Sequence, residues 1–164
     1  MTEREILDGL HQLGIGARNH RLVLLLPLVQ VAWADSEIQA AEREHILETA
    51  RAAGLMDDEG FALVMKWLTV RPSDDDLALG RDILVSLAYR ERGIGADVSA
   101  PDLQRVRDLC EQVASSAGGL FGIAFTISRE ERIALAVIED ALQEASAAFL
   151  DQLPTPENGV LEDL

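Results

Sequence analysis

The segment LVLLLPLVQVAWA (residues 22–34) is apolar on almost every side of the helix that its composition predicts. A helix that is apolar all round has to be covered on all sides, so we expect it at the centre of the domain. Pro27 lies inside this expected helix, at about residues 19–34, and removes one backbone donor, so we expect a kink there. The other elements should therefore pack around this segment.

Apolar residues recur at helical spacing along the rest of the chain, and no stretch alternates convincingly as a strand does. We therefore predict an all-α, single-domain bundle of about seven helices. Four of the other predicted helices span residues 3–13, 39–53, 100–117 and 129–150. A further helix starts near DDEG (57–60) and has Phe61, Val64, Trp67 and Leu68 on one face, and another is capped by Ser73. The stripe predicted for the helix at 100–117 consists of Leu103, Val106, Cys110, Val113 and Ala117. Residues 1–150 form the predicted domain, GGLFGIAF (118–125) a buried connection, and the acidic stretch 151–164 a flexible tail.

The composition limits the partners that the chain can have. The formal net charge is −15, which argues against nucleic-acid binding and is compatible with cations or basic protein partners. The single cysteine, Cys110, cannot form an internal disulfide and fits a reduced compartment. The apolar run at 22–34 is too short to span a membrane stably, and acidic residues precede it, unlike a signal peptide. We expect a cytoplasmic protein.

The apolar segment leads directly into DSEIQAAE (residues 35–42), which matches the second half of a calcium loop with Ser36 in place of the usual glycine. The first half does not match, because Val31 and Trp33 stand where oxygen ligands are needed. The chain therefore has no EF-hand.

The acids of this half-motif still form a candidate metal site. Asp35 is expected to end one helix and Glu42 to lie in the first turn of the next, so both carboxylates can face one small volume; Glu37 is a further candidate. Oxygen-only ligation suits calcium or magnesium. The alternative is that these acids only cap and stabilise helix starts, where Asp and Glu are favoured. The residues alone leave both interpretations open.

A second copy of the helix start occurs downstream. ISREER (residues 127–132) agrees with IQAAER (38–43) at the Ile, the Glu in the second-last position and the Arg, which indicates an internal duplication. Ser128 and Glu131 are spaced as a capping box, so this copy too has a purely structural explanation.

Together, LLPLVQVAWADSEIQAAERE (25–44) and ISREERIALAVIEDAL (127–142) resemble the TerB family of tellurite-resistance-associated proteins, and the resemblance extends over residues 18–148. It implies an all-helical bundle of two related halves. It also implies that acidic residues of the two motifs chelate a divalent metal, and that the protein acts in stress-response assemblies without defined catalysis.

The resemblance assigns residues to the two motifs. Asp35 and Glu42 match the first, and Glu131 matches the glutamate of the second. Ala124 stands where the second motif has an aspartate, and Glu130 is the candidate to replace it. In the first motif, Ser36 replaces glycine, which is tolerable only if the turn needs no positive φ.

We therefore predict a non-enzymatic, TerB-like module that binds calcium or magnesium and a protein partner in a stress-response assembly related to tellurite resistance. The alternative is a metal-free helical interaction module whose acidic motifs are only caps. No catalytic residue is predicted, because Cys110 lies on an apolar stripe and no serine has a nucleophile-elbow pattern. The step Glu42-x-x-His45 is not repeated, since Ala134 takes the histidine position, so a di-iron centre is not expected.

Overall fold

The computed structural model describes the backbone of residues 1–90, 92–116 and 127–152 and the side chains of residues 1–90, 92–116 and 127–143. Within these ranges the chain forms seven α-helices, one 3-10 helix and no strand, which confirms the predicted all-α bundle. In chain order they are α1 (Glu3–Gln12), η1 (Ala17–Leu25), α2 (Leu26–Ala32), α3 (Ala40–Ala52), α4 (Asp58–Thr69), α5 (Asp74–Ala88), α6 (Ala100–Ser116) and α7 (Arg129–Gln152). The connection predicted at 118–125 lies outside the described residues, as does the predicted tail beyond 152.

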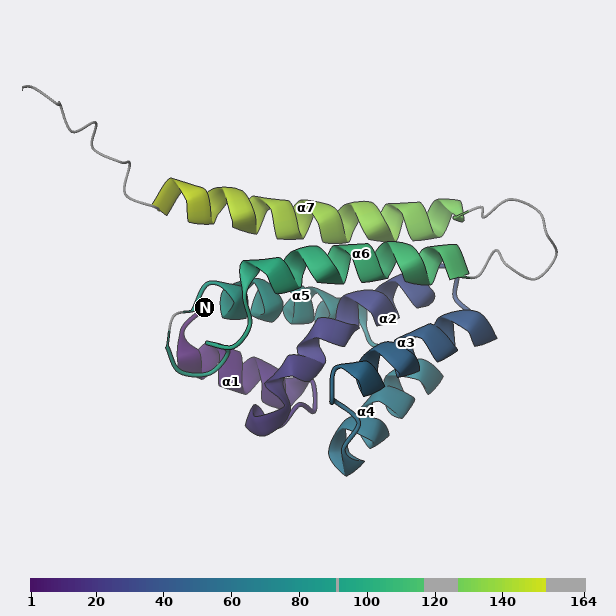
Figure 1. The fold of residues 1–164 in the computed structure, drawn as a ribbon, viewed down its shortest axis with the longest axis horizontal. Helices are drawn as coiled ribbons and strands as arrows, with labels where there is room; N and C mark the ends of the chain where they lie inside the picture. The colour runs from purple at the N-terminus through teal and green to yellow at the C-terminus, as the bar shows by residue number, and fades with distance from the viewer. Residues whose placement is uncertain (91, 117–126, 153–164) are drawn as a thin grey trace, which may run out of the picture.

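Helix α2 is the centre of the bundle, as its composition predicts. Leu28, Val29 and Val31 have no exposed surface, and α2 contacts α3, α5, α6 and α7. Figure 1 shows α6 and α7 running side by side, with α2 and α5 next to α6 and with α3 and α4 farther from α7. None of the helices that the structure describes is both long and apolar enough to cross a membrane.

The prediction of one kinked helix over residues 19–34 is wrong. The chain forms the 3-10 helix η1 and then the α-helix α2, with Asn19 in a non-helical conformation inside η1 (φ −106°, ψ 22°). Pro27 lies in the first turn of α2, where the missing N–H would have no intrahelical acceptor in any case. The proline thus starts a helix here and does not bend one.

The predicted apolar face of α6 is confirmed where it can be seen. Leu103, Val106, Cys110 and Val113 are all buried, while Ala117 lies outside the described residues. Burial also raises the pKa of the Cys110 thiol far above its ordinary range, so this thiol is a core group and not a nucleophile.

The predicted face of α4 is only partly correct. Val64, Trp67 and Leu68 are buried, but the Phe61 side chain is 50% exposed. Asp58 and Glu59 before it are exposed as well, and among the large apolar side chains of this helix burial begins one turn later than predicted, at Val64.

The end of α4 is held by side chains from the segment around the turn between α2 and α3. The Trp33 indole Nε1–H donates to the Trp67 carbonyl oxygen at 2.8 Å, and the Arg43 guanidinium Nη2 donates to the Leu68 carbonyl oxygen at 2.9 Å. Carbonyls in the last turn of a helix lack intrahelical donors, so these two bonds supply what the helix cannot.

The start of α4 leaves no room for a side chain at Gly60. Asp57 caps the helix by accepting the Gly60 N–H at 2.7 Å, and a Cβ at Gly60 would lie 2.0 Å from the Leu55 carbonyl oxygen. Gly60→Ala should therefore lower the free energy of unfolding by about 2–3 kcal/mol in a urea titration, because backbone must move.

Gly54→Ala is the matched control. Gly54 has φ +70° but nothing within 4 Å of an added Cβ, so only the left-handed backbone is penalised, by about 1 kcal/mol. Equal losses in the two variants would contradict the close approach at Gly60.

Candidate metal centre

Two helix starts that are far apart in the sequence meet at one end of the bundle. Glu42 is the third residue of α3 and Glu131 is the third residue of α7, and Figure 1 shows α3 and α7 beginning at the same end. The two glutamates are 1% and 3% exposed. Among the residues whose side chains the structure describes, these two are the charged side chains that are buried. The two motifs found in the sequence thus place one carboxyl group each in the same buried place.

Each glutamate is positioned by its own helix. The Glu42 Oε2 accepts the Gln39 N–H at 2.7 Å, and the Glu131 Oε2 accepts the Ser128 N–H at 2.5 Å. The Ser128 Oγ in turn accepts the Glu131 N–H at 3.1 Å, which confirms the predicted capping box. The sequence repeat is therefore also a repeat of local geometry.

The two carboxyl groups also interact with each other. The negative charge and the side chain of Glu131 are both among the causes that raise the pKa of Glu42. Burial is the largest of the causes that raise the pKa of Glu42 to about 7; the negative charges of Glu131 and Asp35 add to it, and the hydrogen bond from the Gln39 N–H opposes it. Near neutral pH Glu42 is therefore protonated in part of the molecules, and a cation bound there would replace that proton.

Asp35 lies at the edge of this pair and not inside it. Its side chain is exposed in the turn after α2, and its Oδ1 accepts the Glu37 N–H at 3.3 Å. Its charge nevertheless contributes to raising the pKa of Glu42, so the two carboxylates are near enough to interact. Ile38 packs against the core and fixes the end of the turn, as the sequence predicts.

The turn does need a positive φ. Ser36 has φ +74°, in the left-handed region where glycine has no penalty and other residues do. The condition under which serine would be a harmless replacement for glycine is therefore not met, and the first motif keeps its turn at a cost in backbone strain.

The remaining candidate ligands are not brought into the pair. Glu37 and Glu130 are exposed, and Ala124 lies outside the described residues. Over residues 1–90, 92–116 and 127–143, no three His, Cys, Asp or Glu side chains are grouped so that they could hold a metal ion by themselves. The oxygen donors of Glu42 and Glu131 fit a hard cation, provided that water or backbone carbonyls complete its coordination.

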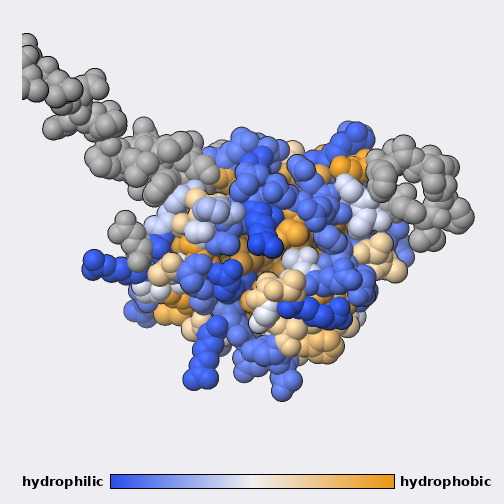
Figure 2. All heavy atoms as spheres, viewed as in Figure 1, coloured by the Kyte–Doolittle hydropathy of each residue, from blue (hydrophilic) through white to orange (hydrophobic). Residues whose placement is uncertain are grey.

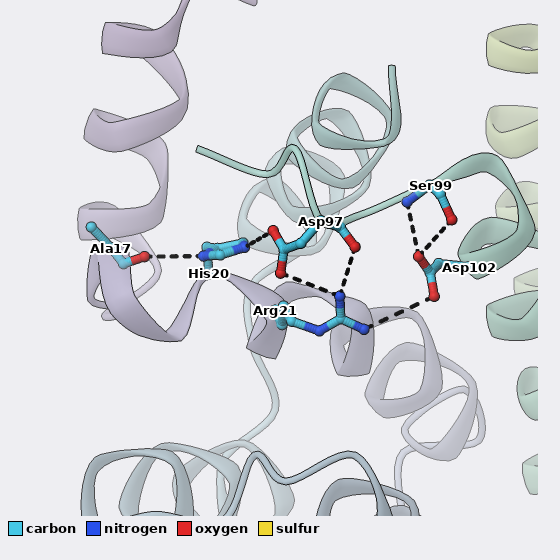
Figure 3. Close-up of polar contacts among 6 residues, drawn as sticks. All are labelled: Ala17, His20, Arg21, Asp97, Ser99 and Asp102. Atoms are coloured by element: carbon cyan, nitrogen blue, oxygen red, sulfur yellow. Dashed lines mark hydrogen bonds and ion pairs between the residues drawn. The ribbon is translucent and has the colours of Figure 1, made fainter. Parts of the chain in front are cut away.

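A second polar arrangement was not predicted from the sequence (Figure 3). The His20 Nε2 lies 2.8 Å from the Asp97 Oδ1, and its Nδ1 lies 3.1 Å from the Ala17 carbonyl oxygen. The Arg21 Nη1 donates to the Asp97 carbonyl oxygen at 2.9 Å and lies 3.4 Å from the Asp97 Oδ2. The Arg21 Nη2 lies 3.9 Å from the Asp102 Oδ1. These contacts join η1 to the start of α6 and the residues just before it. They could not be predicted from a short sequence pattern, because the partners are far apart in the chain.

Comparison with known proteins gives no relative, because no family model, curated protein or solved structure matches this chain.

Replacing Ser36 by glycine should raise the free energy of unfolding by about 0.5–1 kcal/mol, since glycine removes the left-handed penalty but gains freedom in the unfolded chain. Ser36→Ala is the control, because it removes the hydroxyl and keeps the strain, and it should give no gain. Chemical denaturation of the three proteins measures this, and a stabilised alanine variant would show that φ is not the cause.

The pKa of Glu42 predicts how stability depends on pH. The pKa of Glu42 rises from an ordinary value of 4.5 to about 7 on folding. The contribution of Glu42 to the free energy of unfolding is therefore complete below pH 4.5 and is lost as pH rises through 7. The loss should approach about 3 kcal/mol. Glu42→Gln, which keeps an acceptor for the Gln39 N–H, should abolish this loss and be the more stable protein at pH 8.

Glu37→Gln removes the same charge from the exposed turn and should leave the pH dependence between 5 and 8 almost unchanged. Urea titrations at several pH values compare the three proteins. Parallel pH profiles for Glu42→Gln and the wild type would mean that Glu42 does not titrate in this range.

Proposed function

We propose that this chain is a TerB-like, non-enzymatic module that binds a divalent cation between the first turns of α3 and α7. The observation that carries the proposal is the burial of two interacting carboxyl groups, Glu42 and Glu131, from the two copies of the motif. Two carboxylates in one buried place repel each other, and a bound cation would remove both the repulsion and much of the cost of burial.

Capping alone does not account for this arrangement, as another helix of the same chain shows. At the start of α1, Glu5 accepts the Thr2 N–H at 2.7 Å in a complete capping box, but there the glutamate is exposed. Hydrogen bonds from the Thr2 backbone and hydroxyl lower the pKa of Glu5, whereas burial raises that of Glu42. The same local motif thus works in solvent without a second carboxyl group, so burial and pairing call for another explanation.

The expected cation is calcium or magnesium, because the facing donors are carboxylate oxygens. Glu42 and Glu131 would hold it, with Asp35 as the nearest further acid; the cation would supply positive charge that joins the two halves of the bundle. Binding would displace the proton of the pair, so affinity should increase as pH rises through 7.

One observation favours the alternative, a metal-free interaction module. Ile133 and Val137 are 56% and 42% exposed and lie one turn apart on α7, so this helix presents apolar surface to a protein partner. In that case the carboxyl pair would keep its proton and serve only to join α3 to α7. The proposed stress-response assembly is compatible with either state of the pair.

Titration with calcium and with magnesium at pH 8, followed by calorimetry and by thermal unfolding, tests the proposal. The wild type should bind one equivalent and unfold at a higher temperature, because a ligand of the native state stabilises it by mass action. Glu131→Gln should abolish both effects. Glu130→Gln, the adjacent exposed position with the same loss of charge, should retain them.

Asp35→Asn then shows whether the turn belongs to the site, since loss of the cation effect would include Asp35 among the ligands. Sodium at matched ionic strength controls for general screening of the −15 net charge. If the wild type responds to calcium and magnesium no more than to sodium, the proposed cation site does not exist.

A further inference from the structure

A cavity of about 410 Å³ lies between α3 and α6. Leu24, Leu25 and Leu28 from η1 and α2 form its floor, and Val106 and Leu109 from α6 line one wall. Figure 2 shows hydrophobic residues reaching the surface among hydrophilic ones on the face drawn in Figure 1. The volume is in the range of small-molecule pockets, and the lining is mostly apolar as in such pockets.

The cavity contains a buried polar atom without a partner. The His45 side chain, on α3, lines the cavity, and its Nε2 is buried with no hydrogen-bond partner in the described structure. Leaving such an atom unpaired costs about 1–3 kcal/mol, so native structures rarely do so without a reason. A ligand group that bonds to this nitrogen would remove the cost.

The polar side chains that line the cavity without a hydrogen bond or ion pair to a described residue are His45, Glu48, Arg105 and Gln112. Arg21 is bound to Asp97 and Asp102, as Figure 3 shows, but Arg105 makes no hydrogen bond or ion pair with any described residue. Arg105 and His45 come from the two helices that enclose the cavity, α6 and α3. Glu48 is the uncommitted acid at the rim, and it is exposed.

We propose that this cavity binds an aliphatic carboxylate, with its chain on the leucine floor and its head accepting hydrogen bonds from His45 and Arg105. A carboxylate has only acceptors when ionised, which matches donation by the Arg105 guanidinium and by an N–H at the His45 Nε2. This proposal does not rest on the proposed cation site.

The surroundings limit the size and the position of the ligand. A cavity of about 150 Å³ admits benzene, so the space here suits a chain of about eight to ten carbons. Beyond His45 the surface continues into a polar hollow of about 460 Å³ lined by Asp108 and Glu111. These acids repel an anion, so the head group is confined to the Arg105 side of His45.

Sodium decanoate, below its micellar concentration, is the probe. Calorimetry should show saturable one-to-one binding, and spectra of the labelled protein should show shifts at Leu28 and Leu109 but not at Ile133 or Val137. Decanol, which has the same chain without the charge, should bind at least tenfold more weakly.

Three variants test the assignments. His45→Phe keeps the ring shape without the nitrogens and should weaken decanoate binding at least tenfold, and Arg105→Gln should weaken it severalfold. Ala52→Trp fills the cavity from an exposed lining position and should abolish binding, whereas Ala136→Trp, at an exposed position of α7, should not.

Several results would overturn the proposal. These are no saturable binding of decanoate, equal binding of decanol, or unchanged affinity in His45→Phe. Binding that survives in a folded Ala52→Trp protein would place the ligand elsewhere. If Ala52→Trp does not fold, shifts in the unaltered protein decide the matter, and shifts confined to α7 would count against the cavity.

Discussion

The burial of α2 is the requirement on which the other elements depend. This short helix has apolar residues on all sides, and Leu28, Val29 and Val31 have no exposed surface, so neighbouring helices must cover it completely. Because α3 and α7 are both among the covering helices, their first turns are drawn to the same end of the bundle. Glu42 and Glu131 therefore lie on two helices that pack on α2, so both carboxyl groups are attached to elements that enclose the core.

The pair introduces an electrostatic conflict into that well-packed structure. Each glutamate stabilises its own helix by accepting a backbone N–H, but the burial of two acids side by side opposes ionisation. Positive helix starts favour the negative charge, but not enough to keep the pKa of Glu42 at its ordinary value. A fold that needed stability alone would be better with one of these residues apolar, which is typical of positions kept for function.

Much of the fold could be predicted because it depends on local pattern. Helical spacing gave the central position of α2 and the buried face of α6, and the capping box of Ser128 and Glu131 followed from a spacing of three residues. Contacts between distant segments could not be read in this way. The link from His20 to Asp97 and the pairing of Glu42 with Glu131 depend on how helices pack, and the sequence repeat only suggested the second.

Some local features were also missed, for a different reason. A serine in place of glycine is compatible with an ordinary turn, so the sequence does not show that Ser36 has φ +74°. Only the backbone conformation shows it. The boundary between η1 and α2 is equally hidden, because a 3-10 helix and an α-helix both bury an apolar run such as this one. The exposed Phe61 shows that periodicity identifies a face but not where along the helix contact with the core begins.

The bonds from Trp33 and Arg43 to the end of α4 place a fluorescent side chain, the Trp33 indole, at the turn between α2 and α3. Trp33 precedes Asp35 by two residues, and Arg43 directly follows Glu42, so the turn is attached to α4 on both sides. Any rearrangement of that turn will change the hydrogen bond or the solvent contact of a partly buried indole. Fluorescence from Trp33 would therefore report a rearrangement of this turn without an added label, and Trp67, whose carbonyl accepts the bond, lies buried beside it.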